Sequence, residues 1–212
     1  MAFALQPWPG MTMRVLFSDG DDRVSAAIAR LASDGTTAVL LDAPDRAGLA
    51  SRLAARRGAE PALADKLLDR PLYAALAMLA EGEADAVVTG AESHTGDVMR
   101  ACELCLGRGD PARLASSSFV MDVPGRGKLV FSDCAVNPEP TVDQLATIAI
   151  AAGDAASALL GVAPRVALLS FSTHGSAHHE RAARVARATE LARVRRPAMA
   201  IDGELQVDAA LD

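Results

Sequence analysis

Short apolar runs alternate with segments of helical periodicity along this sequence, and no other feature restricts its fold as strongly. The run Arg14–Ser18 reads as a strand. It is followed by apolar residues at helical spacing, namely Val24, Ile28 and Leu31, and Thr37–Leu41 then repeats the strand signal. Strand, helix and strand in this order are typical of a parallel sheet covered by helices. We therefore predict an α/β protein.

The alternation continues through the rest of the chain. Further helices are expected over residues 43–58, 71–82, 97–106, 142–160 and 177–193, and further strands over 86–89, 165–170 and 199–201. Two β-rich runs, at 116–122 and 128–132, are joined by Pro124–Gly127, a turn sequence typical of a β-hairpin. Because a hairpin pairs its strands in antiparallel fashion, we predict a mixed sheet.

The composition indicates how the core is built. Half of the residues are hydrophobic but only 3% are aromatic, so Ala, Val, Leu and Ile must supply the core. A chain of 212 residues buries enough surface for one large domain or two small ones. Pro138 and Pro140 interrupt the pattern just before Thr141–Gln144, which has the spacing of a capping box. We therefore predict a tail at 1–13, a first domain at 14–138 and a second at 139–212.

Charge and apolar runs argue against several classes of protein. The chain has 21 basic and 27 acidic side chains, hence a net charge of −6, which disfavours nucleic-acid binding. The longest apolar run, Leu145–Leu160, is shorter than the ~20 residues that a membrane span needs. No secretory or transit signal is recognisable before Arg14, and three cysteines without framework spacing favour a reducing compartment. We expect a cytoplasmic protein with neither membrane nor nucleic acid as a partner.

Two predicted loops lie between the end of a strand and the start of a helix, where open α/β sheets bind ligands. In Ser170–Ser176, small hydroxyl residues and Gly175 leave backbone N–H groups accessible to phosphate or carboxylate. Gly90–Asp97 forms the same kind of junction. Ser, Thr and Gly are also preferred at ordinary helix starts, so composition alone favours a capped helix over a ligand site.

Cysteine and glycine motifs give little support to metal or nucleotide chemistry. Cys102 and Cys105 have C-x-x-C spacing, but there is no second pair and Cys134 stands alone. The four histidines do not show zinc-ligand spacing to these thiols. We therefore predict buried thiols that share one helix face, and no metal site. Glycine spacing typical of dinucleotide or P-loop binding does not occur.

Several segments together resemble the phosphate acetyltransferase family, and they occur in the family's order from Arg14 onward. They are Asp85–Ala91 with Thr95–Asp97 and Arg100, Ser116–Met121, Phe131–Thr141, Val166–Ala177 and Asp202–Ala210. The resemblance implies reversible acyl transfer between coenzyme A (CoA) and inorganic phosphate, in which acetyl-CoA and phosphate give acetyl phosphate and CoA. The choice between acetyl, butyryl and other acyl groups stays open, because it depends on pocket shape.

The resemblance also implies an architecture and partners. The expected fold is a three-layer αβα protein of the isocitrate dehydrogenase-like type, with two domains and a cleft between them. CoA is expected as a substrate, with no tightly bound cofactor. The family is commonly homodimeric, so a homodimer is expected here.

The same resemblance points to candidate site residues. Arg100 matches the family's arginine in the first-domain cleft, and Arg113 is a second candidate for engaging the phosphoryl group. Arg70 lies near a family arginine implicated in CoA binding. The substrate-binding candidates of the later segments are Ser116, Ser117, Ser172, Thr173, Gly175 and Ser176. The ordinary interpretation of each arginine is a surface residue on a helix or near a turn, and Cys134 is expected near the cleft without acting as the nucleophile.

The sequence also departs from the family. Family members continue past Asp212 through a segment whose Ser-Arg-Gly motif and nearby aspartate supply the catalytic serine, arginine and base. Ser18–Gly20 stands where the family has an opening Pro-Glu-Gly-like motif. We therefore expect an incomplete second domain. A non-catalytic module that binds CoA or acyl phosphate is the alternative to an active enzyme.

Overall fold

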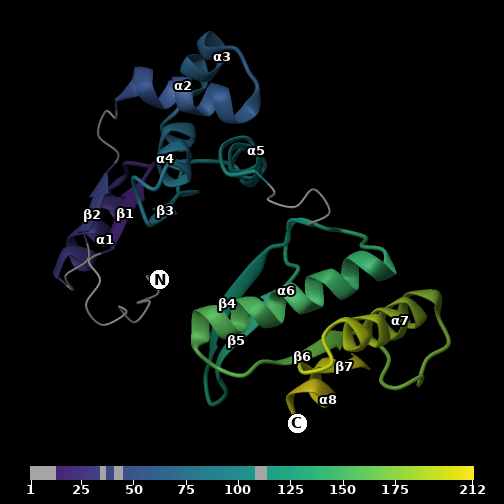
Figure 1. Ribbon diagram of the computed structural model, residues 1–212. Helices are drawn as coiled ribbons and strands as arrows, with labels where there is room; N and C mark the ends of the chain where they lie inside the picture. The colour runs from purple at the N-terminus through teal and green to yellow at the C-terminus, as the bar shows by residue number, and fades with distance from the viewer. Residues whose placement is uncertain (1–12, 34–36, 41–44, 108–113) are drawn as a thin grey trace. The chain divides into compact units, whose positions relative to one another are not determined.

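The computed structural model describes residues 13–33, 37–40, 45–107 and 114–212 (Figure 1). Of the predicted tail at 1–13, all but Met13 lies outside the described residues. The chain divides into two compact units, Met1–Pro111 and Ala112–Asp212. Each unit has its own hydrophobic core and is described by itself.

The first unit is built on a parallel sheet of three strands in the order β2-β1-β3. The strands are β1 (Arg14–Phe17), β2 (Thr37–Leu40) and β3 (Ala86–Val88). Both pairings of β1 are parallel, which confirms the α/β prediction for this unit. As the central strand, β1 buries three consecutive side chains, Val15, Leu16 and Phe17.

Five helices accompany this sheet in the described part of the first unit. They are α1 (Asp22–Ser33), α2 (Arg46–Arg57), α3 (Pro61–Leu67), α4 (Pro71–Ala80) and α5 (Thr95–Cys105). Every residue from Leu72 to Met78 in α4 is buried, as expected for a helix that is apolar on all sides. Leu16, Leu49 and Cys105 belong to the core cluster around it. Helix α3 was not predicted, because seven residues are too few to show a helical period.

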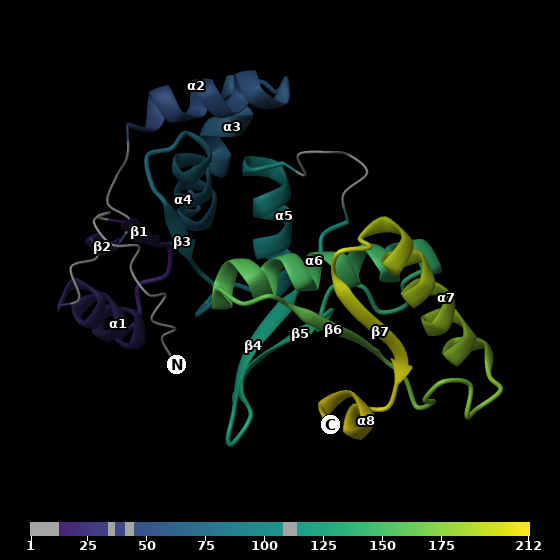
Figure 2. The same cartoon turned by 60° about the horizontal axis from the view of Figure 1, so that its bottom comes forward.

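The second unit combines a hairpin, a parallel strand pair and helices. Its elements are β4 (Ser118–Val123), β5 (Gly127–Ser132), α6 (Val142–Leu160), β6 (Arg165–Leu169), α7 (Glu180–Arg195), β7 (Ala200–Leu205) and α8 (Val207–Leu211). Strands β6 and β7 run parallel and side by side (Figure 2). Helix α6 contacts α7, β5 and β6, and small buried side chains, Ala146, Ala188 and Ala192, form the core between them.

Helix α6 has the ends that its sequence predicts. The Thr141 side chain accepts a hydrogen bond from Gln144 N at 3.2 Å, and the Gln144 side chain accepts one from Thr141 N at 2.9 Å. This reciprocal pair confirms the capping box. At the other end Gly161 takes the left-handed conformation, with φ of 67°. Both ends are fixed by local chemistry, which is why they could be predicted.

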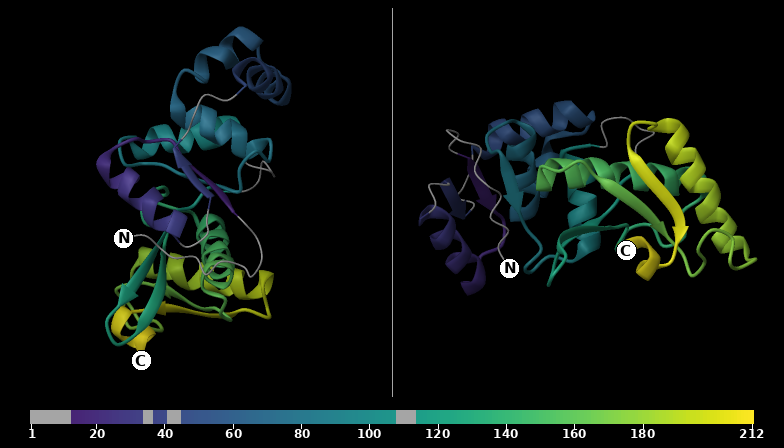
Figure 3. Two further views of the ribbon diagram at one scale, coloured as in Figure 1. Left: turned by 90° about the vertical axis from the view of Figure 1, so that its left-hand side faces the viewer. Right: turned by 90° about the horizontal axis from the view of Figure 1, so that it is seen from below.

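Two predictions about organisation differ from the structure. The predicted hairpin is present, but β4 and β5 pair only with each other as a separate antiparallel ribbon (Figure 3). No sheet in the described residues is mixed, so that prediction was wrong. The division into units falls at Pro111, not after Pro138, because the hairpin packs on α6 of the second unit. Strand β7 is also longer than the predicted 199–201.

None of the helices in the described parts of the chain is both long enough and apolar enough to cross a membrane. The long apolar run of the sequence forms α6 instead, which packs against α7.

Candidate functional site

The first unit has a topological switch point at the carboxyl ends of β1 and β3. The chain leaves β1 for β2 on one side and returns to β3 on the other, and ligands of open α/β sheets bind at such a point. Here the Ser18 hydroxyl donates to Thr89 Oγ1 at 2.7 Å, joining the ends of the two strands. The loop that follows Thr89 leads into α5.

A buried carboxylate occupies this switch point. Asp19 is 7% exposed, and its Oδ2 accepts the backbone N–H groups of Gly90 and Ala91, both at 2.7 Å, and of Glu92 at 3.4 Å. Successive N–H groups of this kind form an anion-binding concavity. The Asp19 carboxylate therefore accepts hydrogen bonds from the first N–H groups of the Gly90–Asp97 loop, which the sequence analysis considered as a ligand site.

Two predicted site residues, Arg70 and Arg100, meet at one carboxylate in the first unit. Arg70 precedes α4 and Arg100 lies within α5, yet both point to Asp97 in the first turn of α5. Arg70 Nη2 lies 3.4 Å from Asp97 Oδ2, and Arg100 Nη1 lies 3.8 Å from Asp97 Oδ1. The structure thus brings together two arginines that are thirty positions apart.

This arginine pair stays accessible. The Arg70 and Arg100 side chains are 48% and 69% exposed, and ion pairs of this length between exposed groups are weak. The Arg70 guanidinium also lies over the ring of Tyr73, 5.0 Å from its centroid. At the N-terminus of α5, His94 makes no side-chain capping bond. Exposed guanidinium groups beside an N-terminus of this kind are suited to bind an anion.

Arg113, the other predicted catalytic arginine, lies outside the described residues. The structure therefore gives it no place relative to Arg100.

Ser116 and Ser117 lie just before β4 in the second unit and bond to the last residue of β5 and to the residues after it. The Ser117 hydroxyl donates to Asp133 Oδ1 at 2.6 Å and accepts the N–H groups of Cys134 and Ala135. Ser116 Oγ lies 3.2 Å from Ser132 Oγ. The serines thus fasten the two ends of the hairpin to each other.

Asp133, which sequence reasoning did not select, is the centre of this group. Burial would raise its pKa, but hydrogen bonds from Ser117, Val136, Asn137 and Ala135 outweigh burial and hold the pKa well below its usual range. The carboxylate is therefore charged at neutral pH. Its position in the Phe131–Thr141 segment was the available signal, because an aspartate followed by backbone N–H groups often forms such a turn.

The other predicted substrate-binding residues, Ser172, Thr173, Gly175 and Ser176, form the loop between β6 and α7. Every backbone N–H from Ser172 to Ala177 donates within the protein. Ser172 is fully buried, whereas Gly175 and Ser176 are exposed. An anion that binds this loop in the described conformation must therefore use side chains rather than backbone donors.

Glu204 of β7 organises that loop. It is 5% exposed, and its Oε1 accepts the Ser172 hydroxyl at 2.9 Å and Gly175 N–H at 2.6 Å. The Gly175 hydrogen bond lowers its pKa most, against the opposing effect of burial, so Glu204 is charged at neutral pH. Sequence reasoning quoted Asp202–Ala210 but missed this residue. A glutamate between Gly203 and Leu205 in a buried strand was the signal.

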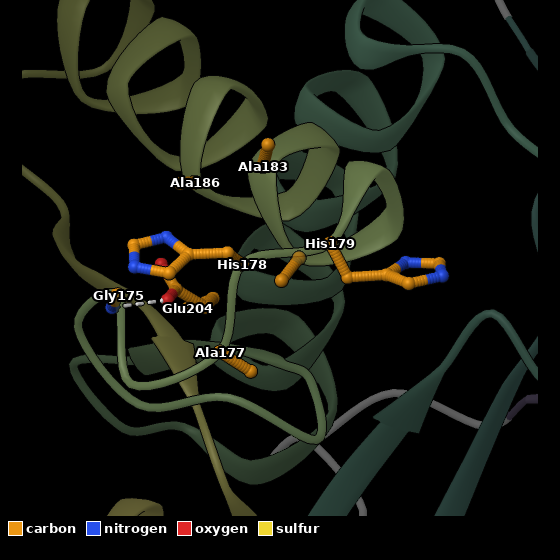
Figure 4. A pocket seen from close by; sticks show the side chains of 8 residues that line it. Gly175, Ala177, His178, His179, Ala183, Ala186 and Glu204 are labelled. Atoms are coloured by element: carbon orange, nitrogen blue, oxygen red, sulfur yellow. Dashed lines mark hydrogen bonds between the residues drawn. The ribbon is translucent and has the colours of Figure 1, made fainter.

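A hollow of about 170 Å³ opens beside Glu204. Small side chains of α7, Ala182, Ala183 and Ala186, line it together with Gly175, Ala177, His178, His179 and Glu204. Figure 4 shows the His178 ring on the side of Gly175 and Glu204, and the His179 ring pointing away. His179 caps α7 by accepting Arg181 N–H at Nδ1. The hollow is thus lined by alanines on one side and polar groups on the other.

The prediction of buried thiols is confirmed for Cys105, whereas Cys102 is only partly buried against the same core. Cys105 is fully buried, and burial raises its pKa to about 11. Burial also raises the pKa of Cys102. Among the described residues, no group of three or more His, Cys, Asp or Glu side chains is placed to hold a metal ion.

Comparison with known proteins links this chain to acyltransferases. A family model described as phosphate acetyl/butaryl transferase matches residues 41–212. The phosphate acetyltransferase of Thermoanaerobacterium thermosaccharolyticum is 46% identical over 145 residues, which cover 66% of this chain and 44% of that protein. The phosphate acetyltransferase of Paracoccus denitrificans is 36% identical over 222 residues, covering 93% of this chain and 70% of that protein.

Solved structures of phosphotransacetylases are also similar to this chain. A phosphotransacetylase from Streptococcus pyogenes matches with a TM-score of 0.80 at 30% identity, covering 94% of this chain and 70% of that one. EutD phosphotransacetylase from Staphylococcus aureus also gives a TM-score of 0.80, at 27% identity, with 92% and 69% covered. The chain spans less than half the length of several curated relatives, for example 44% of the Thermoanaerobacterium thermosaccharolyticum protein. By the family model and these relatives, the chain belongs to the phosphate acetyl/butaryl transferase family.

Proposed function

We propose that this chain transfers an acetyl group between CoA and inorganic phosphate, so that acetyl-CoA and phosphate give acetyl phosphate and CoA. Family membership supports the reaction, and the relatives named above carry the name phosphate acetyltransferase. The observation that carries the proposal is the convergence of Arg70 and Arg100 on Asp97 at the start of α5.

The chemistry needs groups that hold a phosphoryl dianion. In the direction of CoA acetylation, the CoA thiolate attacks the acetyl carbonyl carbon, the carbon–sulfur bond forms, and the bond from that carbon to the phosphate oxygen breaks. The leaving phosphate takes the electron pair of that bond. Arg70 and Arg100 bind this phosphate in our proposal, exchanging the weak contact with Asp97 for a charge-assisted one. Arg113 is a third candidate, and the base for the thiol is left unassigned.

The wider properties of the chain are also proposals. We infer an isocitrate dehydrogenase-like arrangement of αβα layers in two domains. We further propose that the protein is a cytoplasmic homodimer, that CoA is a substrate, and that there is no tightly bound cofactor. The substrate-binding residues would be Arg70, Ser116, Ser117, Ser172, Thr173, Gly175 and Ser176. The family resemblance supports these proposals except the cytoplasmic location, which rests on the cysteine content and the lack of a recognisable targeting signal before Arg14.

The test mixes the purified chain with acetyl phosphate and CoA and follows thioester formation by ultraviolet absorbance. We expect turnover by the parent chain and a loss of about 100-fold in kcat/KM for Arg100→Ala, with Arg113→Ala assayed in parallel. Arg70→Ala should also lose activity, by about tenfold in kcat/KM. Arg52→Ala is the matched control, since Arg52 pairs with Glu81 and Glu83 on the same unit away from Asp97.

Two outcomes would contradict the proposal. A folded chain without turnover would contradict the activity, and calorimetric binding of CoA or acetyl phosphate by that chain would instead favour the non-catalytic alternative. Equal activity of Arg52→Ala, Arg70→Ala and Arg100→Ala would contradict the assignment of the arginines.

A further inference from the structure

Glu204 carries a buried negative charge that packing of the core does not require. An ionised carboxylate is costly to bury unless hydrogen bonds compensate it, and an apolar side chain of similar size would serve packing better. Its neighbours in the sequence, Gly203 and Leu205, lie in the parallel pair of β6 and β7. Glu204 is thus a charged residue whose partners lie almost entirely in one loop.

The end of β7 holds the whole β6–α7 loop. Glu204 accepts from Ser172 and Gly175 through Oε1, and its backbone carbonyl accepts His174 N–H at 3.1 Å. Gln206 N–H donates to Thr173 Oγ1 at 2.8 Å. The Ser172 hydroxyl also accepts Ala177 N–H at 3.1 Å, so Glu204 is connected through Ser172 to Ala177 as well. Four successive loop residues, Ser172 to Gly175, are therefore tied to Glu204 or Gln206.

One of these residues is held in a disfavoured conformation. His174 is the non-glycine residue with positive φ, 46°, in the described part of the chain. The left-handed region is disfavoured for a residue with a Cβ. With its N–H bound to Glu204, the His174 side chain lies 60% exposed, 3.8 Å from Asp202. The loop thus presents an imidazole outward next to the exposed Gly175 and Ser176.

We propose that Glu204 is a positioning residue, which fixes the Ser172–Ser176 loop so that the His174 imidazole and the Ser176 hydroxyl are presented to the acyl phosphate. This inference rests on the proposed function. The backbone donors of the loop are all used internally, so exposed side chains must meet the ligand. These are the His174 imidazole and the Ser176 hydroxyl, whose oxygen accepts Thr173 N–H at 3.0 Å and which would meet the ligand through its hydrogen. Glu204 itself touches no substrate.

The test compares Glu204→Ala with Glu204→Gln, which keeps the size and an accepting oxygen. In Glu204→Ala we expect KM for acetyl phosphate to rise about tenfold while KM for CoA stays within twofold. Glu204→Gln should recover most of that loss. Amide hydrogen exchange at Gly175 and Ala177 should accelerate at least tenfold in Glu204→Ala only. Glu190→Ala is the control, because Glu190 is an exposed carboxylate on α7 paired with Arg193.

The design separates this inference from the proposed function. Loss of folding alone would lower kcat without shifting one KM against the other, so equal effects on both substrates would overturn the positioning role. Unchanged exchange at Gly175 in Glu204→Ala would overturn it even if the parent chain were inactive. An inactive parent with accelerated exchange in Glu204→Ala would support the loop assignment while contradicting the acyl transfer itself.

Discussion

Each unit buries one carboxylate against the loop that follows a neighbouring parallel strand, but the two carboxylates are held by different groups. Asp19, after β1, binds three backbone N–H groups beyond β3. Glu204, within β7, binds one N–H group and the hydroxyl of Ser172 beyond β6. Backbone N–H donors are present for almost any side chain, whereas the hydroxyl donor requires a serine or threonine at position 172. The second loop therefore depends on its sequence in a way that the first does not.

The neighbouring glycines differ as well, and this difference predicts the largest effect. Gly203 has φ of 149°, and an added Cβ would lie 2.8 Å from the Leu168 carbonyl oxygen and 2.7 Å from Thr189 Oγ1. Gly203→Ala should cost about 4 kcal/mol, from backbone strain and overpacking together. Gly90, with φ of 103°, has open space around the Cβ position, so Gly90→Ala should cost only about 1 to 2 kcal/mol.

Urea unfolding followed by hydrogen exchange in β1 and α7 measures these two costs separately for each unit. Similar costs for the two variants would break the comparison, because they would mean that Leu168 and Thr189 move aside without penalty.

Removing the carboxylate of the first unit should have the next largest effect. Asp19→Ala removes the carboxylate that accepts the N–H groups of Gly90 and Ala91, and losing these charge-assisted hydrogen bonds should cost about 2 kcal/mol. Asp19→Asn retains an accepting oxygen and should cost less. The single tryptophan and the single tyrosine, Trp8 and Tyr73, both fall within Met1–Pro111, so intrinsic fluorescence in urea reports on this unit. Equal costs for the two variants would argue that water replaces the carboxylate.

Acid should act on the Glu204 loop with the smallest effect. The folded pKa of Glu204 lies below the ordinary value of 4.5, chiefly through the Gly175 hydrogen bond. Its contribution to stability is therefore fully present above pH 4.5 and is lost as the pH falls through the lower folded pKa. Glu204→Gln should be less stable than the parent at pH 7, and this difference should shrink below pH 4.5.

Urea midpoints of α7 exchange at pH 7 and pH 3.5 measure this change. His174 lowers the pKa of Glu204 and His178 lines the same hollow, so the same comparison in His174→Gln and His178→Gln backgrounds separates their effect from that of Glu204. A difference between the variants that stays constant with pH would show that Glu204 contributes through shape rather than charge.

Local signals in the sequence determined the order and type of the elements. Hydrophobic spacing predicted the strands and most helices, Pro124–Gly127 predicted the hairpin, and Thr141–Gln144 predicted the start of α6. Each signal lies within a few residues, where backbone conformation and side-chain capping act directly. The family resemblance pointed to Arg70 and Arg100, and its Thr95–Asp97 segment contains the carboxylate that joins them, but Asp97 was not selected as a site residue.

Tertiary structure alone decided which polar groups meet. Asp19 and Gly90 are 71 positions apart, and Ser172 and Glu204 are 32 apart, so their pairing follows from strands that lie side by side. Sequence reasoning offered both loops to a ligand, because it recognises free N–H groups at strand ends but not a carboxylate arriving from another strand. A carboxylate that the fold brings to a loop satisfies the same donors as a bound anion, and only the packed chain shows which of the two is present.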